Sequence, residues 1–356
     1  MAKKKKAEVK AKEVTGEKLE TPATESKAKK DVKVDPEELP KALIKYSGIL
    51  RKANDKSFKS VDVIPSGNLR IDIASGIGGY PRGHMIEIFG LEGTGKSTAA
   101  LQAVERAQSL GFRAAYIDIE QALNIGYTKD LGVNLSKLLV SQPNDGEEAA
   151  NLADTLCKSG HVQLVVIDSV DAMIPKAQLE GEIGEGRVAG QSKLMSQTCR
   201  FISKSAKATN TLVIFINQQR DKIQTMGYGG GKTTSGGHAL RFYSRMRIEL
   251  VNKGQWKVGE VTIGQKTTAI FKKNMFAAPY QKADYNIRYG YGALREDQIL
   301  DLAVEMGIVQ QAGSWYNYGD RKLGQGNSSV VELFREEPTF TQKLEDLIRE
   351  KMKENK

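Results

Sequence analysis

The residues best suited to chemistry form the stretch Gly90-Leu91-Glu92-Gly93-Thr94-Gly95-Lys96-Ser97, which matches the pattern G-x-x-x-x-G-K-[S/T]. The apolar run before it, residues 84–89, predicts a strand, and residues 98–110 behind it predict a helix. In that context the backbone N–H groups of the loop turn towards a phosphate. Lys96 adds a positive charge there, and the Ser97 hydroxyl ligates Mg²⁺. The alternative is a glycine-rich turn that caps an ordinary helix, but strand, loop, Lys, Ser and helix in this order favour a phosphate site.

Polar side chains follow three further stretches that read as strands. Asp168 ends the run Leu164-Val165-Val166-Ile167, the form of a Walker B strand, whose Asp holds the Mg²⁺ shell. Glu120 follows residues 113–119, where a carboxylate orients and activates a water; a solvated strand-end Glu is the alternative. Gln218 follows residues 211–216, and its amide suits a γ-phosphate. In open α/β sheets ligands bind at the carboxyl ends of strands, so we expect these side chains at one edge.

Two glycine-bearing loops carry candidates for a phosphodiester backbone. Residues 222–238 have no periodic apolar pattern, and a loop of this length is either functional or a flexible linker. Residues 180–190 precede a helix that we expect over 190–207. The candidate DNA-binding residues are Arg187, Lys193, Arg200, Lys222, Lys232, Thr233, Thr234, Ser235, Gly236 and Gly237.

Alternating strand and helix patterns predict an α/β protein with a mostly parallel sheet. We expect helices over about 40–53 and over 147–158, and strands at 60–64, 138–141 and 162–167. Residues 241–251 and 261–272 read as strands able to pair antiparallel.

The composition of the chain limits the classes of protein to which it can belong. The 356-residue chain is 40% hydrophobic, has no apolar run near the roughly 20 residues of a membrane span, and has no signal peptide pattern. Its two cysteines lie outside any C-x-x-C, and no metal-ligand cluster is evident, so we expect a cytoplasmic protein. The net charge is +10, of which residues 1–34 supply half, with eleven Lys against six acids. We expect residues 1–35 to be disordered, as a weak DNA-binding or a solubilising tail.

The order of the motifs is specific. The segments 90–97, 117–123, 140–143, 167–170, 180–184, 215–218 and 234–240 occur in the order seen in bacterial-type RecA recombinases. The chain resembles this family from about residue 40 to about residue 340. The resemblance implies a RecA-like P-loop NTPase core at 61–294, an N-terminal helix–strand oligomerisation element at 36–60 and a small α+β C-terminal domain at 295–356.

The resemblance also implies an activity. Family members form helical filaments on single-stranded DNA, bind homologous duplex DNA and exchange strands, with ATP and Mg²⁺ held between neighbouring subunits and DNA-stimulated hydrolysis. Glu120 resembles the water-activating glutamate, Gln218 the switch that couples the γ-phosphate to DNA, and Lys273 a cation that reaches the neighbour's phosphates. Phe242 resembles an interface residue. The nucleotide-binding candidates are Glu92, Gly93, Thr94, Gly95, Lys96, Ser97, Thr98, Asn124, Tyr127, Asp168 and Tyr289.

Several positions depart from the family pattern. A second lysine is usual where this chain has Met275, so one cation from the neighbour is missing unless Lys272 substitutes. Gln121 and Asn124 replace a usual His and Asp. Gly229-Gly230-Gly231-Lys232 replaces a more acidic stretch, and the C-terminus lacks an acidic tail, which suggests a divergent or phage-encoded member. Two other functions stay open: a hexameric helicase of the same fold, and a non-catalytic DNA-binding assembly protein switched by ATP.

Overall fold

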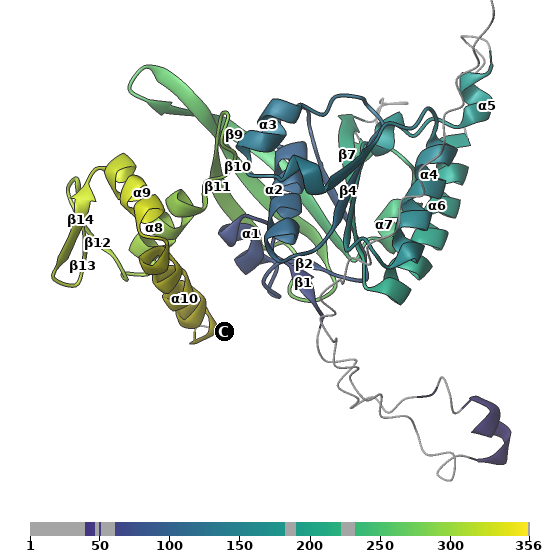
Figure 1. Ribbon diagram of the computed structural model, residues 1–356, viewed down its shortest axis with the longest axis horizontal. Coiled ribbons are helices and arrows are strands. Elements are labelled where there is room, and N and C mark those ends of the chain that lie inside the picture. Colours follow the sequence, from purple (N-terminus) through teal and green to yellow (C-terminus); the bar gives the residue numbers. More distant parts are fainter. Residues whose placement is uncertain (1–39, 47–49, 51–60, 182–189, 222–231, 355–356) are drawn as a thin grey trace, which may run out of the picture. The chain divides into compact units, whose positions relative to one another are not determined.

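The computed structural model (Figure 1) describes residues 40–46, 50, 61–181, 190–221 and 232–354. The chain divides into two units, Met1–Ser60 and Val61–Lys356, which are described separately. In the first unit the described residues hold a 3-10 helix, η2 (Lys41–Tyr46). The helix expected over about 40–53 takes the 3-10 form at 41–46, and most of its remainder lies outside the described residues, as do residues 1–35.

The second unit is built on one large sheet. Within the described residues nine strands join in it, in the order β11-β10-β9-β3-β7-β6-β4-β5, with β8 paired to β7. The strands are β3 (Met85–Gly90), β4 (Ala114–Asp118), β5 (Leu138–Ser141), β6 (Leu164–Asp168), β7 (Leu212–Asp221), β8 (Lys232–Thr234), β9 (Met246–Val258), β10 (Val261–Asn274) and β11 (Lys282–Arg288). The strands β9, β3, β7, β6, β4 and β5 run parallel to one another, which confirms the mostly parallel α/β sheet.

Helices cover both faces of this sheet, which explains the continuous apolar runs of its central strands. In β6, Leu164 and Val166 belong to one core and Val165 and Ile167 to the other, because successive side chains point to opposite faces. The first core packs on α2 (Lys96–Ser109), and the second on α4 (Gly146–Ser159) and α6 (Gly190–Thr209) (Figure 1).

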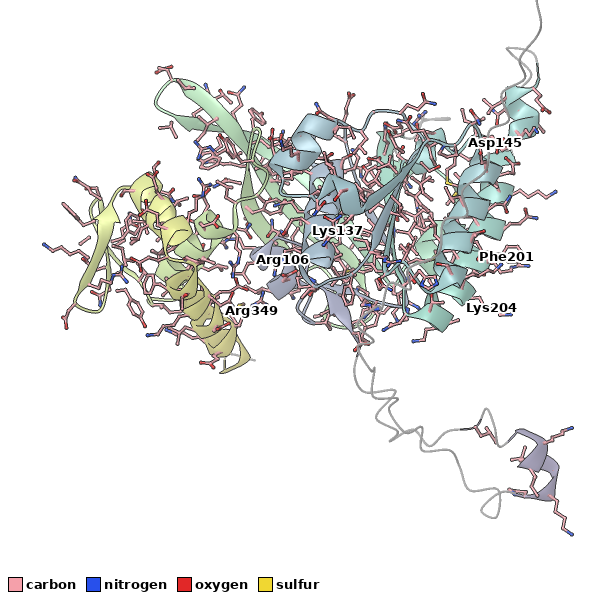
Figure 2. All side chains as sticks on the ribbon, viewed as in Figure 1. Arg106, Lys137, Asp145, Phe201, Lys204 and Arg349 are labelled. Atoms are coloured by element: carbon pink, nitrogen blue, oxygen red, sulfur yellow. The ribbon has the colours of Figure 1, made fainter. Side chains whose placement is uncertain are left out.

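Local signals set the ends of α4, the helix expected over 147–158. The Asp145 carboxylate caps its first turn by accepting from the Glu148 N–H at 2.7 Å (Figure 2), and Gly160 follows it in the left-handed region at φ 67°. Two short strands, β1 (Val63–Ile64) and β2 (Tyr80–Pro81), flank α1 (Leu69–Ala74). The expected strand at 60–64 thus shortens to β1 in the described residues.

Two expectations beyond β7 need correction. Residues 239–243 form a short helix, α7 (Ala239–Tyr243), so the strand expected to begin at 241 begins at Met246 in β9. The loop expected over 222–238 contains β8, which pairs antiparallel with the end of β7; residues 222–231 lie outside the described residues. The strands β9 and β10 do pair antiparallel, as expected.

The C-terminal part of this unit has a core of its own. It consists of α8 (Arg295–Glu305), a three-stranded sheet of β12 (Gln310–Ala312), β13 (Trp315–Tyr318) and β14 (Arg321–Gln325), and the helices α9 (Asn327–Glu336) and α10 (Pro338–Glu354). Val330, Phe334, Leu344 and Ile348 are among its buried residues. This mixture of helices and a small antiparallel sheet confirms the α+β character expected from residue 295.

Candidate functional site

The glycine-rich loop joins β3 to α2, as the motif requires. Gly93 and Gly95 take φ values of 68° and 90°, a region that favours glycine. A Cβ on Gly95 would lie 2.4 Å from Ile287 Cδ1, and one on Gly90 would lie 2.4 Å from the Leu250 carbonyl oxygen. Since no other residue type fits there without movement, the loop holds its N–H groups in one arrangement at the start of α2.

A pocket of about 290 Å³ opens in front of this loop. It is lined by Gly93, Gly95, Lys96, Ser97, Thr98, Tyr127, Gln265, Ile287 and Tyr289. Lys96 Nζ donates to the Leu91 carbonyl oxygen at 2.8 Å. Burial lowers the pKa of Lys96, against the opposing effect of Asp168, Glu120 and Glu92. Its ammonium is therefore held beside the loop by a single carbonyl and is available to a phosphate.

The Walker B carboxylate lies against the loop. Asp168 Oδ2 accepts from Ser97 Oγ at 2.8 Å and from the Tyr116 hydroxyl at 2.5 Å. Burial raises the pKa of Asp168, and these two hydrogen bonds oppose the rise. The described residues contain no group of three or more His, Cys, Asp or Glu side chains that could hold a metal. Mg²⁺ suits this site, because it binds through one or two protein oxygens and completes its shell with water and phosphate.

Glu120 and Gln218 meet at the same edge of the sheet. Gln218 Nε2 donates to Glu120 Oε1 at 3.3 Å, and Ser169 Oγ donates to the same oxygen. The neighbouring carboxylate Asp118 is buried and serves the backbone instead, since it accepts from the N–H groups of Ala122 and Leu123, each at 3.1 Å. Glu120 is thus the exposed acid at this strand end.

Three other nucleotide-binding candidates, Thr98, Tyr127 and Tyr289, also line the pocket. The Tyr127 and Thr98 hydroxyls are 3.0 Å apart, and Tyr289 is 55% exposed at the pocket rim. Asn124 does not line the pocket; its side chain caps α3 (Ile125–Asp130) by accepting from the Tyr127 N–H at 2.9 Å. Asn124 therefore fixes the backbone of Tyr127 at the start of α3.

Lys273 is not among the residues that line the pocket at the P-loop. Its ammonium donates to the carbonyl oxygens of Arg241 at 2.8 Å and Phe242 at 3.0 Å. Burial lowers its pKa, and Arg245 and Arg247 add to this effect. The suggestion that Lys272 substitutes for the missing cation is wrong for this structure, because Lys272 Nζ pairs with Glu249 Oε2 at 2.9 Å.

The candidates at the end of β7 form a connected polar cluster. Asn217 Nδ2 donates to the Ser235 carbonyl oxygen at 3.0 Å, and Ser235 Oγ and the Arg220 guanidinium both donate to the Asp171 carboxylate. Gly236 and Gly237 pack so closely that a Cβ on either would lie within 2.9 Å of Val170 or Ser192. Thr234 is 6% exposed.

The remaining nucleic-acid candidates lie on α6, on β8 or outside the described residues. Lys193 and Arg200 are exposed on α6, a helix with no acidic residue. Figure 2 shows Phe201 and Lys204 of α6 turned away from the sheet. Lys232 and Thr233 belong to β8 by their backbone, and Arg187 and Lys222 lie outside the described residues.

Three residues that the sequence reasoning missed support this site: Tyr116, Ser169 and Asp171. Tyr116 carried a usable signal, because a Tyr inside a buried strand needs a partner for its hydroxyl. Ser169 and Asp171 carried no such signal in the sequence, because their hydrogen-bond partners come from other strands.

A P-loop, a Walker B carboxylate and a third polar strand end in one mostly parallel sheet define an ATPase of the RecA-like fold class. Family models described as RecA N-terminal domain and RecA C-terminal domain match residues 35–294 and 297–353. The chain therefore belongs to the RecA family, and it is a DNA-dependent ATPase and a recombinase.

Individual relatives agree with this assignment. "Protein RecA" of Methylococcus capsulatus is 46% identical over 303 residues, which cover 85% of this chain and 87% of that protein. "Protein RecA" of Halalkalibacterium halodurans is 44% identical, with 85% and 86% covered. The crystal structure of the RadB recombinase shares the fold, with a TM-score of 0.50 and 22% identity over 65% of this chain and 98% of that one. In the described part of the chain no helix is long and apolar enough to span a membrane.

Proposed function

We propose that this protein forms helical filaments on single-stranded DNA in the cytoplasm, pairs that strand with homologous duplex DNA and exchanges strands. ATP with Mg²⁺ binds between neighbouring subunits and is hydrolysed when DNA is bound. One observation carries the proposal: β7 begins in the core, presents Gln218 to Glu120, and continues to Asp221 in the ribbon with β8. A change at the nucleotide therefore reaches the DNA candidates through one strand.

The proposed division of the chain follows from this activity. Residues 1–35 form a basic tail, 36–60 an element that docks on the neighbouring subunit, 61–294 the ATPase core and 295–356 a domain that assists capture of duplex DNA. The break between units after Ser60 supports a docking element that is separate from the core.

The residues around the P-loop have separate tasks in ATP hydrolysis. The loop N–H groups and Lys96 bind the phosphates, and Tyr127 and Tyr289 line the wall where a base fits. Mg²⁺, held by Ser97 and Asp168, neutralises phosphate charge when bound. Glu120 accepts a proton from a water molecule. The oxygen of that water bonds to the γ-phosphorus while the bond between this phosphorus and ADP breaks.

Gln218 couples the two events. Its amide contacts Glu120 in this structure at 3.3 Å, and an amide can instead donate to a γ-phosphate. Two nearby residues of β7, Asn217 and Arg220, contact Ser235 and Asp171, which also bond to each other. We propose that this exchange of partners shifts the β7–β8 ribbon and so alters its hold on DNA.

The second half of the site comes from the next subunit. Lys96 is the single Lys or Arg among the described residues that line the pocket, which leaves much of a triphosphate's charge uncompensated. Lys273 lies beside Phe242, which is 78% exposed and suits an interface between subunits. Lys273 therefore acts on the neighbour's nucleotide.

ATP turnover with and without single-stranded DNA tests the proposal. We expect DNA to stimulate turnover in the natural protein and expect Lys96→Ala and Glu120→Gln to abolish it. Turnover that ignores both DNA and the two substitutions would contradict the proposal. Electron microscopy of the ATP-bound complex separates an open filament from the closed ring of a hexameric helicase.

A further inference from the structure

Met275 has an arginine as its neighbour. The Met275 N–H donates to the Arg245 carbonyl oxygen at 3.0 Å, and Arg245 Nη1 donates to Met275 Sδ at 3.2 Å. The Arg245 N–H in turn donates to the Met85 carbonyl oxygen at 2.9 Å, which ties its backbone to the start of β3. The backbone of Arg245 is therefore fixed on both sides, and its guanidinium contacts the side chain at position 275.

Strand register puts this arginine on the same face as Lys273. Lys273 lies opposite Arg247 in the β9–β10 pair, and Asn274 lies opposite Met246. Because side chains alternate along a strand, Arg245 and Met275 continue the face that Lys273 and Arg247 occupy. We call Arg245, Lys273 and Met275 the trans patch.

The charges on this face differ in how far they are neutralised. Arg247 pairs with the buried Glu87 carboxylate and lies 4.6 Å from the centre of the Phe89 ring. Neither Arg245 nor Lys273 has an acidic partner within 4.0 Å among the described residues. Arg245 and Lys273 thus lack an acidic partner among the described residues, whereas Arg247 and Lys272 each have one.

Other basic groups nearby are excluded as substitutes. Burial lowers the pKa of His84 to about 4, with contributions from Lys207 and Arg245, so this imidazole is neutral at physiological pH. Lys272 is paired with Glu249, at 2.9 Å between Nζ and Oε2. Arg245 is the remaining exposed cation that touches position 275.

We propose that Arg245 supplies, to the nucleotide of the neighbouring subunit, the second positive charge that position 275 lacks. This rests on the proposed function, in which Lys273 acts across the same interface. A guanidinium stays charged beside another cation and binds phosphate through two parallel hydrogen bonds, which an ammonium does not do. The Met275 thioether helps to position the guanidinium, since its sulfur accepts from Arg245 Nη1 at 3.2 Å.

Substitution at position 245 tests the proposal in the full-length protein. We expect Arg245→Gln to lower kcat of DNA-stimulated ATP hydrolysis at least about tenfold with KM changed less than about threefold, because a charge used in the transition state acts on kcat. Arg245→Lys should recover part of the loss. Adding Met275→Lys to Arg245→Gln should restore kcat to within about threefold of the natural protein, since it returns one cation to the patch.

Two comparisons make the outcome decisive. Lys282→Ala removes an exposed charge at the edge strand β11 and should leave kcat unchanged. If Lys273→Ala lowers kcat and Arg245→Gln does not, or if Met275→Lys fails to rescue, the role of Arg245 is refuted and the proposed function stands. If neither Lys273→Ala nor Arg245→Gln has an effect, the shared site itself is refuted.

Discussion

The Tyr116 hydroxyl contacts Asp168 of the candidate Mg²⁺ site, a contact that the sequence did not predict. Removal of this hydroxyl should change the Mg²⁺ dependence of ATP hydrolysis. Tyr116 is 1% exposed, and its hydroxyl donates to Asp168 Oδ2 at 2.5 Å, the same oxygen that Ser97 Oγ reaches at 2.8 Å. Tyr116→Phe keeps the ring and deletes this donor alone. Tyr116 does not line the pocket, and its hydroxyl contacts Asp168, so we expect the effect to pass through Asp168.

The magnitude follows from the chemistry of that contact. A hydrogen bond to a charged group contributes about 1.5–3 kcal/mol, and loss of an outer partner of a metal ligand typically weakens metal binding about 10–100-fold. We expect the Mg²⁺ concentration for half-maximal ATP turnover to rise at least about tenfold. Burial already raises the pKa of Asp168, and the lost donor opposed that rise. Activity should therefore fall at a higher pH on acidification than in the natural protein.

The assay is steady-state ATP hydrolysis on single-stranded DNA over a Mg²⁺ series, repeated across pH. Tyr80→Phe is the matched control, because Tyr80 is fully buried and its hydroxyl has no hydrogen-bond partner among the described residues. It should leave the Mg²⁺ dependence unchanged. If Tyr116→Phe behaves like Tyr80→Phe, Asp168 does not hold the metal in the way argued above.

Three further outcomes follow from single residues. Burial raises the pKa of Asp72 from 3.8 to about 7, so its contribution to stability is full below about pH 4 and is lost as pH rises through about 7. Asp72→Asn should remove that trend, at most about 4 kcal/mol, in urea unfolding followed from acid to neutral pH; an unchanged trend would refute it. Gly95→Ala forces a Cβ to 2.4 Å from Ile287 Cδ1 at φ 90° and should weaken ADP binding at least about tenfold by calorimetry; unaltered binding would show that the loop adapts. Gln218→Ala should abolish stimulation by DNA while basal turnover changes less than about threefold, and retained stimulation would exclude Gln218 as the coupling residue.

The parts of the fold that the sequence predicted are those encoded by neighbours in the chain. The P-loop lies within eight consecutive residues, and Asp168 directly follows an apolar run, so both could be found without any contact between distant segments. The alternation of strands and helices also follows from local periodicity, and it predicted the parallel sheet.

Two elements that the sequence did not predict correctly have separate physical causes. Residues 239–243 form α7 although their apolar spacing also suits a strand, because such short runs do not separate the two. The strand β8 escaped notice because three polar residues pair there only through the edge of β7. Pairing of that kind depends on a partner, which single-sequence patterns do not contain.

The parts of the site that could not be predicted depend on strand register. Tyr116 reaches Asp168 because β4 and β6 are parallel neighbours, and Arg245 reaches Met275 because β9 and β10 pair with Met246 opposite Asn274. A shift of one residue would turn each side chain to the other face. Neither contact leaves a trace in composition or motif spacing.

The central claim is that one subunit contributes Glu120 and the next contributes Lys273 to a single ATP site. Mixing equal amounts of Glu120→Gln and Lys273→Ala proteins on single-stranded DNA tests it directly. If subunits assemble at random through head-to-tail interfaces, about a quarter of the sites in the mixture hold both intact residues, so turnover should rise to about a quarter of the natural rate. Turnover no higher than the average of the two variants would contradict the shared site.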